Sequence, residues 1–142
     1  MTLAPEQVHR YARHLLVPEV GRAGQERLLA ATVSVALTPG DGAAVAALAY
    51  LAAAGVGHLR LAGDTAGPVT AADLAAALLY RTADLGRPRG DVLIDHLHAL
   101  NPDVHVAVGA GEPLAIARTG DRADSLILGA GAAVTAIAAL TS

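Results

Sequence analysis

The sequence predicts an α/β fold of the Rossmann-like, doubly wound type, with a mainly parallel sheet and helices on both faces. Two observations favour this class. Short β-branched or apolar runs alternate with longer Ala-rich runs, as strands alternate with helices. The first strand-like run is followed by a glycine-containing turn and then by a helical run, the order of a βαβ unit. Strands joined in this way lie parallel, and the connection between them is right-handed.

The first thirty residues are expected to form a helical arm. Pro5 suits the first turn of a helix over Pro5–Leu16, because proline has no amide hydrogen to lose there. Gly21 and Gly24 are expected to interrupt the following segment. A second, shorter helix is predicted at Gln25–Ala30.

The βαβ unit comes next. Thr32–Leu37 (TVSVAL) is β-branched and mostly apolar, which is typical of a buried strand. The turn at Thr38–Gly42 leads into an Ala-rich helix, Ala43–Ala54, and Gly55 ends that helix. His58–Ala62 (HLRLA) is predicted as the second strand.

The second half of the chain continues the alternation. Thr70, followed three residues later by Asp73, approximates a capping box at the start of a helix that reaches about Ala83. The other predicted elements are helix Asp91–Leu100, strand Val104–Val108, strand Ser125–Leu128 and helix Ala132–Leu140. With no repeat and no linker, one domain over residues 1–142 is expected.

Composition and spacing argue against several classes of function. A net charge of −3 without a basic run argues against nucleic acid as a partner. The absence of cysteine excludes disulfides, thiolate zinc sites and thiol nucleophiles, and the histidine spacing indicates no metal site. The apolar segments Gly42–Gly57 and Ser125–Leu140 are shorter than the roughly 20 residues of a spanning helix. We therefore expect no membrane partner and a cytoplasmic location.

Four segments, in this order and spacing, resemble the MoeB/ThiF/HesA family of adenylating enzymes, which are related to ubiquitin-activating enzymes. They are RYARHLLVPEVGRAGQERLL (Arg10–Leu29), YLAAAGVGHLRL (Tyr50–Leu61), TADLGRPR (Thr82–Arg89) and LHALNPDVHV (Leu97–Val106). The resemblance implies a dimerisation arm at 1–30 and a Rossmann-like core at 31–142. It also implies MgATP-dependent adenylation of the C-terminal glycine of a ubiquitin-like or sulfur-carrier protein.

The resemblance also indicates where ATP would bind. Gly40 and Gly42 lie in the turn that matches the family's phosphate loop, Asp64 in the place of the ribose-binding acid, and Arg89 in the place of a lysine. Only Gly42 keeps the glycine pattern of that loop. The neighbouring Asp41 adds a negative charge where triphosphate should lie.

Other positions of the family's active site have changed in this chain. Asp73 stands in place of an asparagine, and Ala76 and Ala77 replace the arginine and glutamine that follow it. Gly131 replaces the aspartate that holds Mg²⁺, and glycine has no side chain to bind a metal. Because electrostatic stabilisation usually dominates such catalysis, we expect a degenerate ATP site, no metal and no bound cofactor.

Arg13 is the one catalytic contribution that the resemblance leaves intact. In homodimeric relatives the matching arginine reaches across the dimer to the partner's ATP. An alternative interpretation places Arg10 and Arg13 in surface ion pairs. We therefore predict a non-catalytic scaffold or regulatory subunit that pairs with itself or with a full-length ThiF/MoeB homologue, with a ubiquitin-like or sulfur-carrier protein as a further partner. The alternative is a minimal ATP- and Mg²⁺-dependent adenylyltransferase using Arg13, Asp64 and Arg89.

Overall fold

Three parallel strands form the sheet at the centre of the structure, a computed structural model that describes residues 2–116 and 122–142. The strands are β1 (Thr32–Leu37), β2 (His58–Gly63) and β3 (His105–Val108), and they lie in the order β1-β2-β3. Thr32 pairs with His58, and His58 pairs with His105. The parallel α/β fold expected from the sequence is confirmed.

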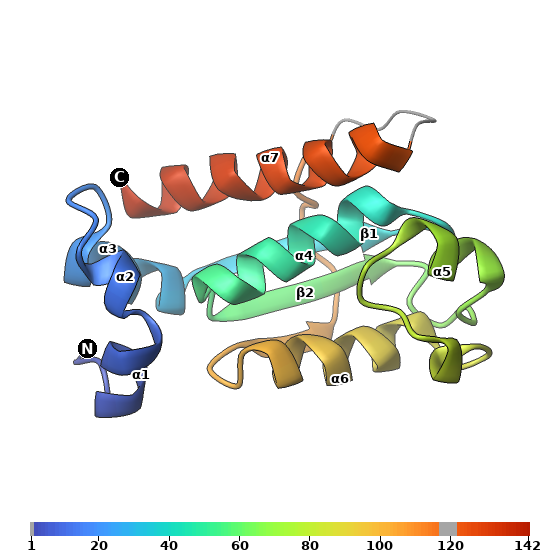
Figure 1. Ribbon diagram of the computed structural model, residues 1–142, viewed down its shortest axis with the longest axis horizontal. Coiled ribbons are helices and arrows are strands. Elements are labelled where there is room, and N and C mark those ends of the chain that lie inside the picture. Colours follow the sequence, from blue (N-terminus) through green and yellow to red (C-terminus); the bar gives the residue numbers. More distant parts are fainter. Residues whose placement is uncertain (1, 117–121) are drawn as a thin grey trace.

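The helices occupy the connections and the two ends of the chain (Figure 1). They are α1 (Pro5–Arg10), α2 (Ala12–Leu15), α3 (Gly21–Ala30), α4 (Gly42–Ala54), α5 (Ala71–Ala76), the 3-10 turn η1 (Thr82–Asp84), α6 (Arg89–Leu100) and α7 (Arg122–Thr141). α4 joins β1 to β2, α6 leads into β3, and α7 packs along α4.

One face of the sheet carries the core. Val35 and Leu37 of β1 and Leu59 and Leu61 of β2 are buried with the apolar sides of α4 and α6. The opposite face presents the alternate residues of each strand, and in β2 these include the exposed polar residues His58 and Arg60. The chain after β3 crosses this second face, where Gly111 lies beside the side chains of Ser34 and Arg60. It then pairs with the edge of β1, where Pro113 forms a parallel bridge with Ser34 and the Leu114 amide donates to the Ser34 carbonyl oxygen at 2.7 Å.

The helical arm is tied to the core through Tyr11, which is 1% exposed. Its hydroxyl donates to Asp103 at 3.0 Å and accepts from the Asn101 side chain at 2.9 Å. Arg10 pairs with the same Asp103 carboxylate at 3.0 Å. The predicted helix Pro5–Leu16 is therefore broken at Tyr11, because this ring turns into the core.

The prediction for α3 was wrong at its glycines. α3 begins at Gly21 and continues through Gly24 without interruption. Gly24 is buried, and a methyl group built on it would contact the side chains of Val20 and Thr141. The glycine therefore allows α3 to approach the carboxyl end of α7 closely.

The predicted strand at Ser125–Leu128 was also wrong, because these residues lie inside α7. A β-branched or apolar tetrapeptide has no fixed preference when a long Ala-rich helical run follows it. Gly129 of α7 lies so close to α4 that a methyl group would overlap the Ala43 carbonyl. Helix packing at this glycine therefore decides the conformation of the segment.

The helix predicted from Thr70 to about Ala83 is shorter than expected. Its start is confirmed, since Thr70 and Asp73 form the capping box of α5. α5 ends at Ala76, and η1 follows after an extended connection. Within residues 2–116 and 122–142, no helix combines the length and apolar character that a bilayer-spanning segment needs.

Candidate functional site

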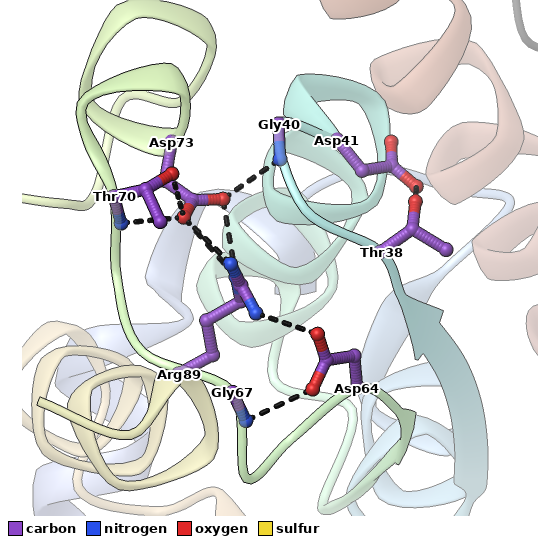
Figure 2. A network of polar contacts seen from close by, with 8 residues as sticks. All are labelled: Thr38, Gly40, Asp41, Asp64, Gly67, Thr70, Asp73 and Arg89. Atoms are coloured by element: carbon purple, nitrogen blue, oxygen red, sulfur yellow. Dashed lines mark hydrogen bonds and ion pairs between the residues drawn. The ribbon is translucent and has the colours of Figure 1, made fainter. Parts of the chain in front are cut away.

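The candidate site lies at the carboxyl ends of β1 and β2, where open α/β sheets bind ligands. The turn after β1 brings Gly40 to the site with a φ of +71°, a left-handed conformation that favours glycine. The loop after β2 brings Asp64. α5 and the start of α6 complete the site with Asp73 and Arg89 (Figure 2).

The Asp73 carboxylate is at the centre of the network, with 1% of the residue exposed. It accepts hydrogen bonds from the Gly40 amide at 2.8 Å, from the Thr70 amide at 2.8 Å and from the Thr70 hydroxyl at 3.0 Å. Arg89 Nη2 pairs with its Oδ2 at 2.9 Å. A buried carboxylate that receives this many donors is fully satisfied inside the protein.

Arg89 connects the two acidic residues of the site. Its guanidinium is 2% exposed, and Nη1 pairs with Asp64 Oδ2 at 2.9 Å while Nε and Nη2 contact Asp73. Asp64 also accepts from the Gly67 amide at 2.9 Å, which fixes its carboxylate beside the arginine. One cation is therefore shared between two anions, and its charge offsets one of the two negative charges.

The electrostatics of the network follow from this geometry. Burial disfavours the charged form of Asp73, but hydrogen bonds from Arg89, Gly40 and Thr70 outweigh it and hold the pKa of this carboxyl at about 2. Hydrogen bonding to Asp73 raises the pKa of Arg89 above its usual value, against the effect of burial. Both groups are thus held ionised at neutral pH.

The turn that resembles a phosphate loop is packed and capped from within. Asp41 Oδ1 accepts from the Ala44 amide at 3.0 Å and so caps the amino end of α4. A methyl group on Gly42 would overlap the carbonyl of Ala76, so α5 lies directly against this turn. The amino end of α4, which would attract phosphate, already has the Asp41 carboxylate.

The structure brings all four residues of the predicted nucleotide site into one neighbourhood. Gly40, Asp64 and Arg89 join the same network, and Gly42 packs beside it. The sequence pattern noted Asp73 only as a replacement for an amide, and its position as the shared acceptor of the network was missed. The capping box at Thr70 was the available signal, because it fixes the Asp73 side chain near the start of α5.

Arg13 lies far from this network, on α2 in the helical arm. Its side chain is exposed, and among the described residues it has neither a hydrogen bond nor an ion pair. Arg10, by contrast, is held by Asp103. The two arginines of the motif therefore differ, since Arg10 fastens the arm and Arg13 is available to solvent.

Comparison with known proteins matches residues 11–138 to the ThiF family. This chain belongs to the ThiF family. The sulfur carrier protein adenylyltransferase of Thermus thermophilus is 41% identical over 106 residues, which cover 75% of this chain and 38% of that protein. Protein HesA of Trichormus variabilis is 35% identical, with 89% of this chain and 44% of the relative covered. The ThiF chain thus spans about two fifths of the length of these relatives.

Solved structures give the same ThiF-type fold. PaaA has a TM-score of 0.67 and 30% sequence identity, covering 75% of this chain and 34% of PaaA. The E. coli tRNA N6-threonylcarbamoyladenosine dehydratase TcdA, solved in complex with AMP, has a TM-score of 0.65 at 17% identity, covering 77% of this chain and 42% of TcdA. The likeness to TcdA concerns the fold alone.

Proposed function

We propose that this chain is a non-catalytic ThiF-family scaffold whose nucleotide site has been closed by an internal ion network. It acts as a binding or regulatory subunit, paired with itself or with a full-length homologue of the family. The observation that carries the proposal is the hydrogen bond from the Gly40 amide to Asp73. In a phosphate loop such an amide must be free for the ligand, and here a protein carboxylate takes it.

The charge of the closed site supports the same conclusion. An incoming triphosphate would have to displace Asp73 from Gly40 and Thr70, and Arg89 from both of its carboxylates. Displacement would leave buried charges without partners, which costs several kcal/mol. It would also place phosphate beside Asp41 and Asp73, two negative charges. The ligand would therefore bind at a large energetic disadvantage.

The exposed Arg13 supports the role in a pair of chains. An arginine supplied from a neighbouring chain can stabilise transition-state charge in phosphoryl chemistry. In this proposal Arg13 serves an active homologue, whose partner protein is the ubiquitin-like or sulfur-carrier substrate. Adenylation of such substrates is named for relatives, among them the sulfur carrier protein adenylyltransferase and the SAMP-activating enzyme E1 of Haloferax volcanii.

The test is ATP–pyrophosphate exchange by a full-length homologue from the same organism, with and without this chain. We expect no exchange by this chain alone, a co-purifying complex with the homologue, and a rate that falls at least about tenfold when Arg13→Ala replaces the original chain. Arg22→Ala, an exposed arginine on α3, is the matched control and should leave the rate unchanged. No complex, or equal rates for Arg13→Ala and Arg22→Ala, would contradict the proposed pairing.

The second candidate is the minimal adenylyltransferase. It is favoured by one observation, that Gly40, Asp64 and Arg89 remain together at the carboxyl ends of the strands. Exchange activity of this chain by itself, abolished by Arg89→Met, would establish it in place of the scaffold.

A further inference from the structure

A polar hollow lies on the face of the sheet opposite the buried core. This face, which α4 and α6 do not cover, is called the open face. It has a volume of about 530 Å³, and its polar lining consists of Thr32, His58, Arg60 and His105. Thr32 pairs with His58 and His58 with His105, so these three residues form one row across the sheet. Arg60 lies two residues further along β2 and points to the same face.

This hollow is separate from the Asp73 network. Thr32 and His58 are the first residues of β1 and β2, whereas Gly40 and Asp64 follow the last residues of the same strands. At about 3.3 Å per residue, the length of β2 separates His58 from Asp64 by roughly 20 Å. The hollow therefore lies at the opposite end of the sheet, and the inference below does not depend on the proposed function.

The side chains of the hollow have unused hydrogen-bonding capacity. Within the described part of the chain, the imidazole rings of His58 and His105 make no hydrogen bond or ion pair, and these nearly parallel rings have their centres 5.8 Å apart. The Arg60 guanidinium has one hydrogen bond to a described residue, a donation to the Ala110 carbonyl at 3.4 Å. Other arginines, such as Arg87 and Arg89, are paired with carboxylates. Of the residues that the structure describes, those that line the hollow include no acidic side chain.

The chemistry of the lining favours an anion over a metal cation. The described residues contain no group of three or more His, Asp or Glu side chains arranged for a metal, and the Arg60 charge repels cations. A hydroxyl, a guanidinium and two imidazoles can all donate to oxygen. The carboxyl end of α3 lies nearby, but the carbonyls of Leu28 and Ala31 already accept from Gly57 and His58.

We propose that this hollow binds an oxyanion of the phosphate class, as inorganic phosphate or a phosphate monoester. Arg60 provides the fixed positive charge, and His58 and His105 donate to separate oxygens from neighbouring strands. Thr32 supplies a hydroxyl at the end of the row. Hydrogen bonds between charged donors and phosphate oxygens are roughly twice as strong as neutral ones, so the Arg60 guanidinium gives the largest single share of the affinity.

The experiment is an NMR titration of the six histidines of this chain, with inorganic phosphate, O-phosphoserine and acetate as probes at constant ionic strength. We expect saturable shifts of the His58 and His105 ring protons with phosphate, with a dissociation constant in the low-millimolar range or tighter, on the order of 1 mM. His98, exposed on α6, should not shift. Equal response to O-phosphoserine identifies monoesters as ligands, and response to inorganic phosphate alone identifies the free ion.

Arg60→Ala should weaken phosphate binding at least about tenfold. Arg60→Gln provides a second variant that keeps a polar side chain but removes the charge, and Arg81→Ala is the control at a distant exposed arginine. Thermal unfolding of each variant confirms that it is folded. Shifts that do not saturate, that are as large and saturate as readily in Arg60→Ala and Arg60→Gln as in the original chain, or that acetate produces at equal concentration would overturn the proposal.

Discussion

At the scale of single residues, the most informative substitution is the carboxylate of Asp73. Its position resembles an amide that contacts phosphate in the family, and the structure shows what the change to an acid does. The side chain takes the Gly40 amide and the Arg89 guanidinium for itself, and 1% of the residue remains exposed. In the proposed function, the charge of this one carboxylate takes the place of the charge of a ligand.

The Arg89–Asp73 pair is expected to be strongly coupled. Arg89→Met leaves two carboxylates without their cation and should lower the free energy of unfolding by about 3–5 kcal/mol. Asp73→Leu should cost a similar amount, and the double variant should cost clearly less than the sum of the two. Urea unfolding measures all three. The coupling is contradicted if Arg89→Met lowers the free energy of unfolding no more than Arg81→Met, the control at an exposed arginine.

A fall in pH should lower the free energy of unfolding because Asp73 becomes protonated. The pKa of this carboxyl is about 2 in the folded protein, below the usual 3.8, so the unfolded state takes up the proton first as pH falls. The contribution of roughly 2–3 kcal/mol is complete above about pH 5 and lost towards pH 2. Asp84, whose pKa is also lowered, against the effect of burial, by a hydrogen bond from His96, acts in the same direction.

The measurement is the free energy of unfolding across that pH range for the original chain and for the Asp73→Leu/Arg89→Met double variant. The double variant should show a shallower loss, because it has no carboxylate at position 73. Parallel pH curves for the two proteins would show that Asp73 does not contribute as described.

At the scale of elements, α7 shows where tertiary packing overrides local preference. Leu126 to Leu128 favour a strand in isolation, yet the segment is helical because α7 lies along α4. Gly129 and Gly131 of this helix differ in the space around their Cα atoms. A methyl group on Gly129 would overlap Ala43, whereas Gly131 has open space around it.

These two glycines make a matched pair of variants. Gly131→Ala should raise the free energy of unfolding by about 0.5–1 kcal/mol, because alanine favours a helix over glycine. Gly129→Ala should lower it by about 1–3 kcal/mol, because the helices must separate to admit the methyl group. Thermal unfolding with circular dichroism tests both. Equal effects at the two positions would contradict the packing of α7 on α4.

Particular residues explain which elements the sequence could predict. β1 was placed at its observed bounds because Thr32–Leu37 is strongly β-branched, and the start of α5 was found from Thr70 and Asp73. The contact between Asp73 and Gly40 was not foreseen, because it joins residues 33 apart and depends on how α5 packs. The burial of Tyr11 likewise depends on Asn101 and Asp103, far along the chain.

At the scale of the whole molecule, the sheet has two ends with different properties. The carboxyl end is closed by ion pairs among Arg89, Asp64 and Asp73. The amino end of the open face presents His58, Arg60 and His105 without carboxylate partners among the residues described. The helical arm, held by Tyr11, presents Arg13 to solvent. In the proposed function, the carboxyl end of the sheet no longer admits nucleotide because the charges of the protein are paired with one another there.

The attachment of the helical arm to the core should depend on the hydroxyl of Tyr11. Tyr11→Phe removes the hydrogen bonds to Asp103 and from Asn101, and leaves their polar groups without this partner. We expect a loss of about 1–3 kcal/mol in the free energy of unfolding and faster hydrogen exchange in α1 and α2 than in α4. Tyr50→Phe, at a half-exposed tyrosine of α4, is the control and should have little effect. Unchanged exchange in the arm would contradict its proposed attachment.

The central claim is that the internal network excludes nucleotide, and isothermal titration calorimetry of this chain with MgATP tests it most directly. We expect no saturable binding heat up to about 5 mM MgATP, and no rise in the melting temperature, because a ligand that does not bind the native state cannot stabilise it. Saturable binding below that concentration, accompanied by a rise of several degrees and abolished by Arg89→Met, would contradict the account.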